Sequence, residues 1–126
     1  MVTGIEHIAI MSKDTEKLKN WYQEMFGFKI VYDNGKGTFF LMVEDGSMIE
    51  FVKSDETVEK ESAKLCGIRH LAFSVDNFEE MVEKLKKNSV EIITEASVSS
   101  SGIKTFFFRD IDDNVIHLIY RPKALG

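Results

Sequence analysis

The chain has 126 residues, a length typical of one domain that buries about two thirds of its unfolded surface. Apolar residues make up 44% and charged residues 29%, with one Pro and eight Gly, which excludes a disordered or fibrous chain. The net charge of -5, without a dense basic run, argues against nucleic acid as a partner.

Membrane insertion and export are not indicated either. The longest apolar stretch, Phe39 to Val43, is far shorter than the about 20 residues that span a bilayer, and no basic segment leads an apolar core at the N-terminus. The lone Cys66 cannot form an intramolecular disulfide, and we expect it to be buried as a small apolar side chain. These features predict a soluble, cytoplasmic protein.

In chain order, the first half predicts a strand, a helix and three strands. A strand is expected over residues 4–10, and an amphipathic helix follows, with apolar residues at helical spacing from Leu18 to Met25. Asp14 is placed to cap this helix and Gly27 to end it. Strands are then expected over residues 28–32, 38–43 and 48–52, separated by Asn-Gly and Asp-Gly turns.

The second half repeats the same order. The sequence GIEHIAI at residues 4–10 returns as GIRHLAF at residues 67–73, and a second amphipathic helix follows from Phe78 to Leu85. Asp76 with Glu79 has the spacing of a capping box, and Asn88 is expected to end the helix. Strands are expected over residues 90–95, 103–109 and 115–120.

This pattern predicts an α+β fold of two βαβββ modules. Module 1 covers residues 1–53, an exposed linker covers residues 54–66, and module 2 covers residues 67–122, with each boundary approximate. Each module has only one helix to cover its sheet. We therefore expect the two to pack on each other as a single domain over residues 1–126.

All three histidines fall on repeated positions. His7 and His70 are equivalent in the two opening strands, and alignment of residues 48–51 with 115–118 makes Glu50 equivalent to His117. If the modules pack symmetrically, these four donors converge on a divalent metal ion. Three imidazoles and one carboxylate suit Ni, Zn, Co, Mn or Fe(II), and the set does not select among them. The alternative is that each histidine is a hydrogen-bonded strand residue.

Two other features of the second half concern the same region. The run Phe106-Phe107-Phe108 indicates a strand buried on both faces, one of whose rings could line a pocket. Arg109 is expected near the site because its strand should pair with that of His117, or else to form an ion pair with Asp110 or Asp112.

Over essentially its whole length the chain resembles the vicinal oxygen chelate superfamily, which includes glyoxalase I, bleomycin resistance proteins and extradiol dioxygenases. The resemblance is carried by the opening strands with His7 and His70, the helix followed by Gly27-Phe28, the strand with Glu50, and the closing segment 107–116. It implies a cupped mixed sheet with pseudo-twofold symmetry, helices outside, and a divalent metal bound by the first and last strands of each module.

The residues match the family's pattern in part. His7, Glu50 and His70 match ligand positions of glyoxalase I-like members, whereas His117 stands where those members usually carry Glu. Ile111 and Asp113 stand where Pro and Gly are common. His117 could therefore complete the coordination or act as a general base near its ordinary pKa of about 6.5.

The resemblance implies a metal-dependent lyase or isomerase, similar to lactoylglutathione lyase, that chelates adjacent substrate oxygens and moves a carbon-bound proton via an enediolate. His117 and Glu50 are the expected catalytic residues. The alternatives are an Fe(II) ring-cleaving dioxygenase and a small-molecule (drug) binding protein without chemistry, and fosfomycin-type thiol transfer also stays open. A homodimer is expected from the length of family members.

Overall fold

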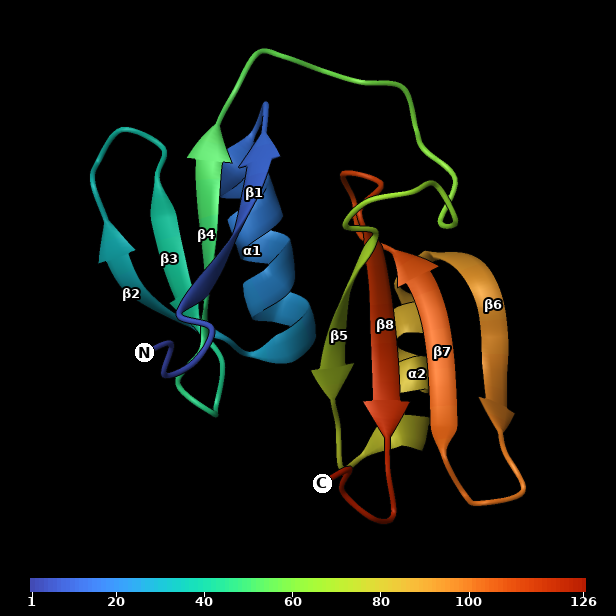
Figure 1. Ribbon diagram of the computed structural model, residues 1–126. Helices are drawn as coiled ribbons and strands as arrows, with labels where there is room; N and C mark the ends of the chain where they lie inside the picture. Colours follow the sequence, from blue (N-terminus) through green and yellow to red (C-terminus); the bar gives the residue numbers. More distant parts are fainter. The chain divides into compact units, whose positions relative to one another are not determined.

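The computed structural model describes residues 1–126, which divide into two compact units, Met1–Val58 and Glu59–Gly126. Each unit consists of a strand, a helix and three further strands (Figure 1). The predicted α+β class and the repeated βαβββ order are confirmed. No helix has the length and apolar character needed to cross a membrane.

Unit 1 is a four-stranded mixed sheet with one helix. Its elements are β1 (His7–Ser12), α1 (Thr15–Phe26), β2 (Lys29–Asp33), β3 (Phe39–Met42) and β4 (Met48–Lys53). The strand order is β1-β4-β3-β2, in which β1 is parallel to β4 and the other neighbours are antiparallel. Helix α1 is a crossover that returns the chain, so β2 starts in the same direction as β1. Strands β2, β3 and β4 then alternate in direction, which makes β4 parallel to β1.

Helix α1 begins and ends as predicted. The Asp14 carboxylate accepts a 3.0 Å hydrogen bond from the Lys17 amide, and Gly27 ends the helix with a φ of 70°. Leu18 and Tyr22 are fully buried on one face of this helix, and the Tyr22 ring packs against that of Phe51 in β4. The helix therefore covers one face of the sheet and leaves the opposite face to the alternate strand residues.

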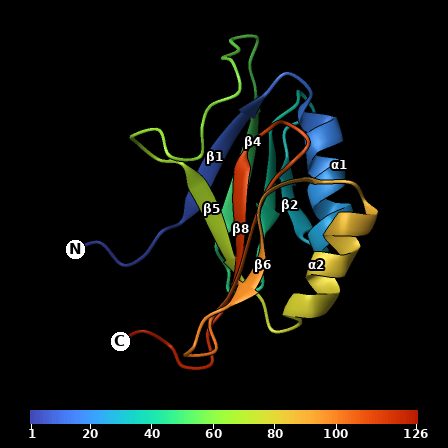
Figure 2. The ribbon, with the colours of Figure 1, turned by 90° about the vertical axis from the view of Figure 1, so that its right-hand side faces the viewer.

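Unit 2 repeats this arrangement. Its elements are β5 (His70–Ser74), α2 (Phe78–Lys87), β6 (Glu91–Val98), β7 (Lys104–Arg109) and β8 (Val115–Tyr120). The strand order is β5-β8-β7-β6, with β5 parallel to β8. Again the helix lies on one face of its own sheet (Figure 2), over a core that includes Phe106, Phe108, Ile116 and Leu118.

The start of α2 differs from the prediction. Asn77, not Asp76, occupies the capping position, and its side chain makes no capping hydrogen bond. The helix begins one residue later than the capping box requires, so the Asp76 carboxylate stands outside the first turn. Asn88 ends the helix as predicted.

Three further expectations are corrected. Strand β6 extends to Val98, beyond the expected end at residue 95, because it continues to pair with β7 through Ser97 and Val98. Cys66 is exposed rather than buried, since it lies in the connecting segment before β5. Phe107 is half-buried, unlike its fully buried neighbours, because its side chain points away from α2.

Candidate metal centre

The first pair of predicted ligands lies in unit 1. His7 in β1 is aligned with Met48 in β4, and Ala9 with Glu50, so both His7 and Glu50 lie on the sheet face away from α1. The His7 Nε2 atom is 3.6 Å from Glu50 Oε1, and the two side chains are 38% and 22% exposed. This separation is too long for a normal hydrogen bond. Two metal–ligand bonds of about 2.1 Å at an open angle span a gap of about this size.

A second carboxylate orients the His7 ring. His7 Nδ1 donates a 2.6 Å hydrogen bond to Glu6 Oε1. In a neutral imidazole this bond leaves the lone pair on Nε2, the nitrogen nearest Glu50. Histidines that bind metals usually donate their other ring nitrogen to such a partner. Two electron-pair donors thus face each other across a gap that a cation would fill, and the donor set fits a metal ion.

The second pair lies in unit 2. His70 in β5 is aligned with Val115 in β8, and Ala72 with His117, which repeats the register of unit 1. The rings of His70 and His117 meet edge to face, with centroids 5.4 Å apart and an interplanar angle of 87°. His117 is only 9% exposed, and its Nε2 atom is buried without a hydrogen-bond partner. A buried donor or acceptor without a partner is costly, which again fits an absent ligand.

The surroundings of His117 change what its imidazole can do. Burial first, and then the charges of His70 and Arg121, lower the pKa of His117 to about 4. The ring is therefore neutral at pH 7, as a metal ligand must be. Because desolvation disfavours the imidazolium form, His117 is a weaker base than an imidazole with the ordinary pKa of about 6.5.

The structure thus brings the four residues together as two pairs, one in each unit: His7 with Glu50, and His70 with His117. Neither unit by itself holds a group of three or more His, Cys, Asp or Glu side chains suited to a metal ion.

The Arg109 guanidinium is held by partners within unit 2 and has a structural role. Its Nη1 donates a 2.7 Å hydrogen bond to the Asp113 carbonyl oxygen, and its Nη2 a 2.8 Å hydrogen bond to that of Glu61. Its Nε lies 3.3 Å from a Glu91 carboxylate oxygen, and the residue is only 8% exposed. Strands β7 and β8 pair as predicted, but the guanidinium secures a turn and the connecting segment.

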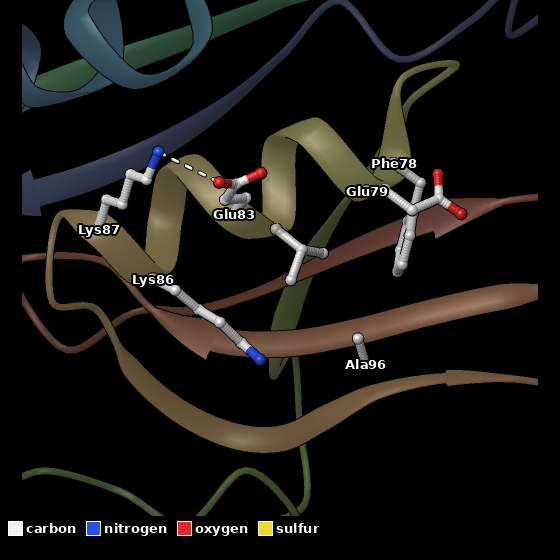
Figure 3. A pocket seen from close by; sticks show the side chains of 7 residues that line it. Phe78, Glu79, Glu83, Lys86, Lys87 and Ala96 are labelled. Atoms are coloured by element: carbon white, nitrogen blue, oxygen red, sulfur yellow. Dashed lines mark ion pairs between the residues drawn. The ribbon is translucent and has the colours of Figure 1, made fainter.

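A separate groove of about 450 Å³ lies on the helix side of unit 2, between α2 and β6 (Figure 3). Phe78, Val82 and Ala96 form its apolar floor. The charged groups at its rim are paired, Lys87 with Glu83 and Lys86 with Glu95. The groove contains no histidine and no unpaired acid, so we assign it no chemistry.

Two aromatic residues lie on the histidine faces: sequence reasoning missed Phe40, and it did not single out Phe107 among the three phenylalanines of which one was expected to line a pocket. Phe40 in β3 is aligned with Glu50, and Phe107 in β7 is aligned with His117. The signal was in the repeat, because alignment of residues 39–42 with 106–109 places both rings at the same position. The run of three phenylalanines did not reveal which ring lies on this face, because it indicated a strand buried on both faces.

The comparisons with known proteins identify the family. The model of the Glyoxalase/Bleomycin resistance protein/Dioxygenase superfamily matches residues 4–118. The chain belongs to this superfamily. The resemblance that the sequence motifs suggested is therefore confirmed.

Individual relatives cover most of the chain. The fosfomycin resistance protein FosX of Listeria innocua is 28% identical over 120 residues, covering 94% of this chain and 90% of the relative. The uncharacterised protein YaeR of Escherichia coli is 32% identical over 116 residues, covering 86% and 88%. A FosX variant from Listeria monocytogenes, crystallised with Mn(II) and 1S,2S-dihydroxypropylphosphonic acid, aligns with a TM-score of 0.76 at 24% identity, covering 94% and 90%.

Proposed function

We propose that this superfamily member is a divalent-metal-dependent enzyme whose ligands are His7, Glu50, His70 and His117. The observation that carries the proposal is the paired donors in unit 1, where His7 Nε2 faces Glu50 Oε1 at 3.6 Å with its other nitrogen held by Glu6. The buried Nε2 of His117, which has no partner, supports it from unit 2. The metal would act as a Lewis acid on two adjacent oxygens of a small substrate.

The ligand set has consequences for the substrate. One carboxylate and three neutral imidazoles leave a divalent site with a net charge of +1. Such a site favours an anionic ligand more strongly than one with two carboxylates. Ni, Zn, Co, Mn and Fe(II) all suit these donors.

The reaction that we propose is that of a lyase or isomerase that moves a carbon-bound proton. The catalytic residues of this proposal are His117 and Glu50. The half-buried Glu50 carboxylate lies on the same sheet face as His7, where it would take the proton from one carbon and return it to the next. Because the pKa of His117 is lowered to about 4, its imidazole is uncharged at neutral pH and can hold the metal.

Solvent exchange tests this reaction. The metal-loaded protein would be incubated in deuterated water with a hemithioacetal and with a 2-methylacyl thioester, and the substrate carbon followed by NMR. We expect deuterium at that carbon with the wild type and none with Glu50→Gln. If neither substrate takes up deuterium at this carbon, the protein does not catalyse proton transfer on a hemithioacetal or on a 2-methylacyl thioester.

Opening of fosfomycin is a second candidate, favoured by the relatives named fosfomycin resistance protein. Fosfomycin is a phosphonate and so has the anionic character that a +1 site favours. Phosphorus NMR of fosfomycin with the metal-loaded protein, with and without a thiol, separates addition of water from addition of thiol. An unchanged spectrum in both arms removes this candidate.

The same preparation distinguishes the remaining alternatives. Oxygen uptake with catechols under Fe(II) would identify a ring-cleaving dioxygenase. Tight binding of a small molecule without its conversion, unaffected by His7→Ala, would identify a drug-binding protein. Sedimentation of the same samples tests the expected homodimer.

A further inference from the structure

The ring of Phe107 lies flat against that of His117. Their centroids are 3.9 Å apart, and their planes differ by only 12°. The edge of His70 also meets Phe107, with centroids 5.4 Å apart and an angle of 85°. Phe107 therefore contacts both histidines of unit 2.

Phe40 occupies the equivalent position in unit 1. It is aligned with Glu50 in the β3–β4 register, as Phe107 is aligned with His117 in the β7–β8 register. The edge of its ring meets that of His7, with centroids 5.5 Å apart and an angle of 71°. The repeat thus includes an aromatic ring beside both histidines of the opening strands, together with the two pairs of donors.

The stacking matters because of how imidazole rings rotate. The torsion that turns the His ring about its Cβ–Cγ bond is broad, so the plane of an unsupported imidazole varies. A flat aromatic ring stacked on one face holds that plane better than an aliphatic side chain of smaller area. His117 makes no hydrogen bond through Nε2 that would fix its ring.

We propose that Phe107 is a positioning residue that fixes the plane of the His117 ring so that Nε2 stays directed to a metal ion, and that Phe40 does the same, more weakly, for His7. The proposal rests on the proposed function, since it presumes that these histidines bind metal. The effect of Phe40 is weaker because its contact is edge to face and because Glu6 already holds His7 Nδ1.

The test measures Co(II) affinity by the visible absorption of the bound ion. We expect Phe107→Leu and Phe107→Met each to weaken Co(II) binding at least ten-fold, in the range typical of residues that support a ligand. Phe107→Tyr keeps an aromatic ring and should keep the affinity of the wild type. Phe40→Leu should weaken binding less. Phe28→Leu is the matched control, because Phe28 stacks on Phe26 at 5.4 Å and lies outside the strands that carry the pairs.

A second readout does not depend on metal. In protein freed of metal with a chelator, stacking on Phe107 should shift the NMR signals of the His117 ring protons upfield. Phe107→Leu should abolish this shift, and Phe107→Tyr should keep it. Unchanged Co(II) affinity in both Phe107→Leu and Phe107→Met would overturn the proposal, as would the absence of the upfield shift from the wild type. If the wild type shows the shift but binds no metal, the proposed function and the metal-directing role that rests on it both fail, and only the ring contact stands.

Discussion

Arg109 and Asp113 are joined by a 2.7 Å hydrogen bond from the guanidinium Nη1 to the Asp113 carbonyl oxygen, which closes the turn between β7 and β8. This turn leads directly into the strand that carries His117. The Asp110 carboxylate supports the same turn by accepting hydrogen bonds from the amides of Asp112 and Asn114. The position of His117 therefore depends on a turn that is fixed from both ends.

Removing the guanidinium should be costly. Arg109→Met removes the hydrogen-bond donors of the Asp113 and Glu61 carbonyl oxygens, and it takes a buried guanidinium away from the Glu91 carboxylate. We expect the free energy of unfolding to fall by about 2–4 kcal/mol in urea denaturation. Arg121→Met is the matched control, since Arg121 is exposed, and it should change stability by less than about 0.5 kcal/mol. Equal effects of the two variants would refute the structural role of Arg109.

Asp113 has a left-handed backbone, with a φ of 67°. Glycine adopts this conformation without strain, whereas a β-branched residue does not. We expect Asp113→Val to lower the free energy of unfolding by about 1–2 kcal/mol and Asp113→Gly to leave it within about 0.5 kcal/mol. Loss of the 3.9 Å ion pair of Asp113 with Lys60 contributes little, because both side chains are exposed.

The neighbouring position supplies the control for this comparison. Asp112 does not have a positive φ, so glycine there raises the entropy of the unfolded chain without relieving any backbone strain. Thermal melts should rank Asp112→Gly below Asp113→Gly. The reverse order would show that the left-handed conformation of Asp113 costs nothing.

The lowered pKa of His117 predicts how stability depends on pH in the metal-free protein. Between pH 6.5 and about 4 the unfolded chain binds a proton at this residue that the folded chain does not. The free energy of unfolding must therefore fall as the pH drops through this range, by up to about 3 kcal/mol. Above pH 6.5 the contribution is constant.

Two variants isolate this effect. Subtracting the pH profile of His117→Gln from that of the wild type should leave a slope confined to pH 4–6.5. Arg121→Gln should raise the pKa of His117 in NMR titration, because it removes one of the charges that lower it. A difference profile without slope would contradict the burial of an uncharged His117.

Glu6 should matter for metal binding although it is not a proposed ligand. Its carboxylate accepts the Nδ1 proton of His7, and we expect Glu6→Gln to weaken metal affinity by about 10-fold. Calorimetric titration with Ni or Zn measures this. Glu44→Gln, which neutralises another exposed carboxylate of unit 1, should leave the affinity unchanged. A similar loss in both variants would point to general electrostatics rather than ring orientation.

The sequence repeat predicted the order of elements and the strand positions of the four candidate donors, but not that they lie as one pair in each unit. Alternation in β1 and β4 fixes which side chains share a face, and the parallel register then places His7 beside Glu50. Strand β8 spans Val115–Tyr120 as predicted, because its run of apolar residues is bounded by a turn.

Features that depend on tertiary contacts were not predictable in this way. Asp76 and Asn77 are both good capping residues, and the burial of Phe78 as the first helical residue is a tertiary contact that their spacing does not reveal. The low pKa of His117 depends on burial and on the neighbouring charges of His70 and Arg121, which no spacing reveals. Cys66 is exposed because the connecting segment has no apolar face to bury it.

The proposal that His7, Glu50, His70 and His117 bind a divalent metal ion is tested most directly on protein freed of metal with a chelator. Its metal content and melting temperature would be measured after addition of Ni, Co, Zn, Mn or anaerobic Fe(II). A metal at about 100 times its Kd stabilises the folded state by about 2.7 kcal/mol, which corresponds to about 10 °C for a chain of this size.

We predict one ion per chain and this rise in melting temperature for the wild type and for Cys66→Ala, which removes the exposed thiol. His7→Ala in unit 1 and His117→Ala in unit 2 should each lose both. A wild type that no metal stabilises would contradict the account, and so would histidine variants that keep the full shift.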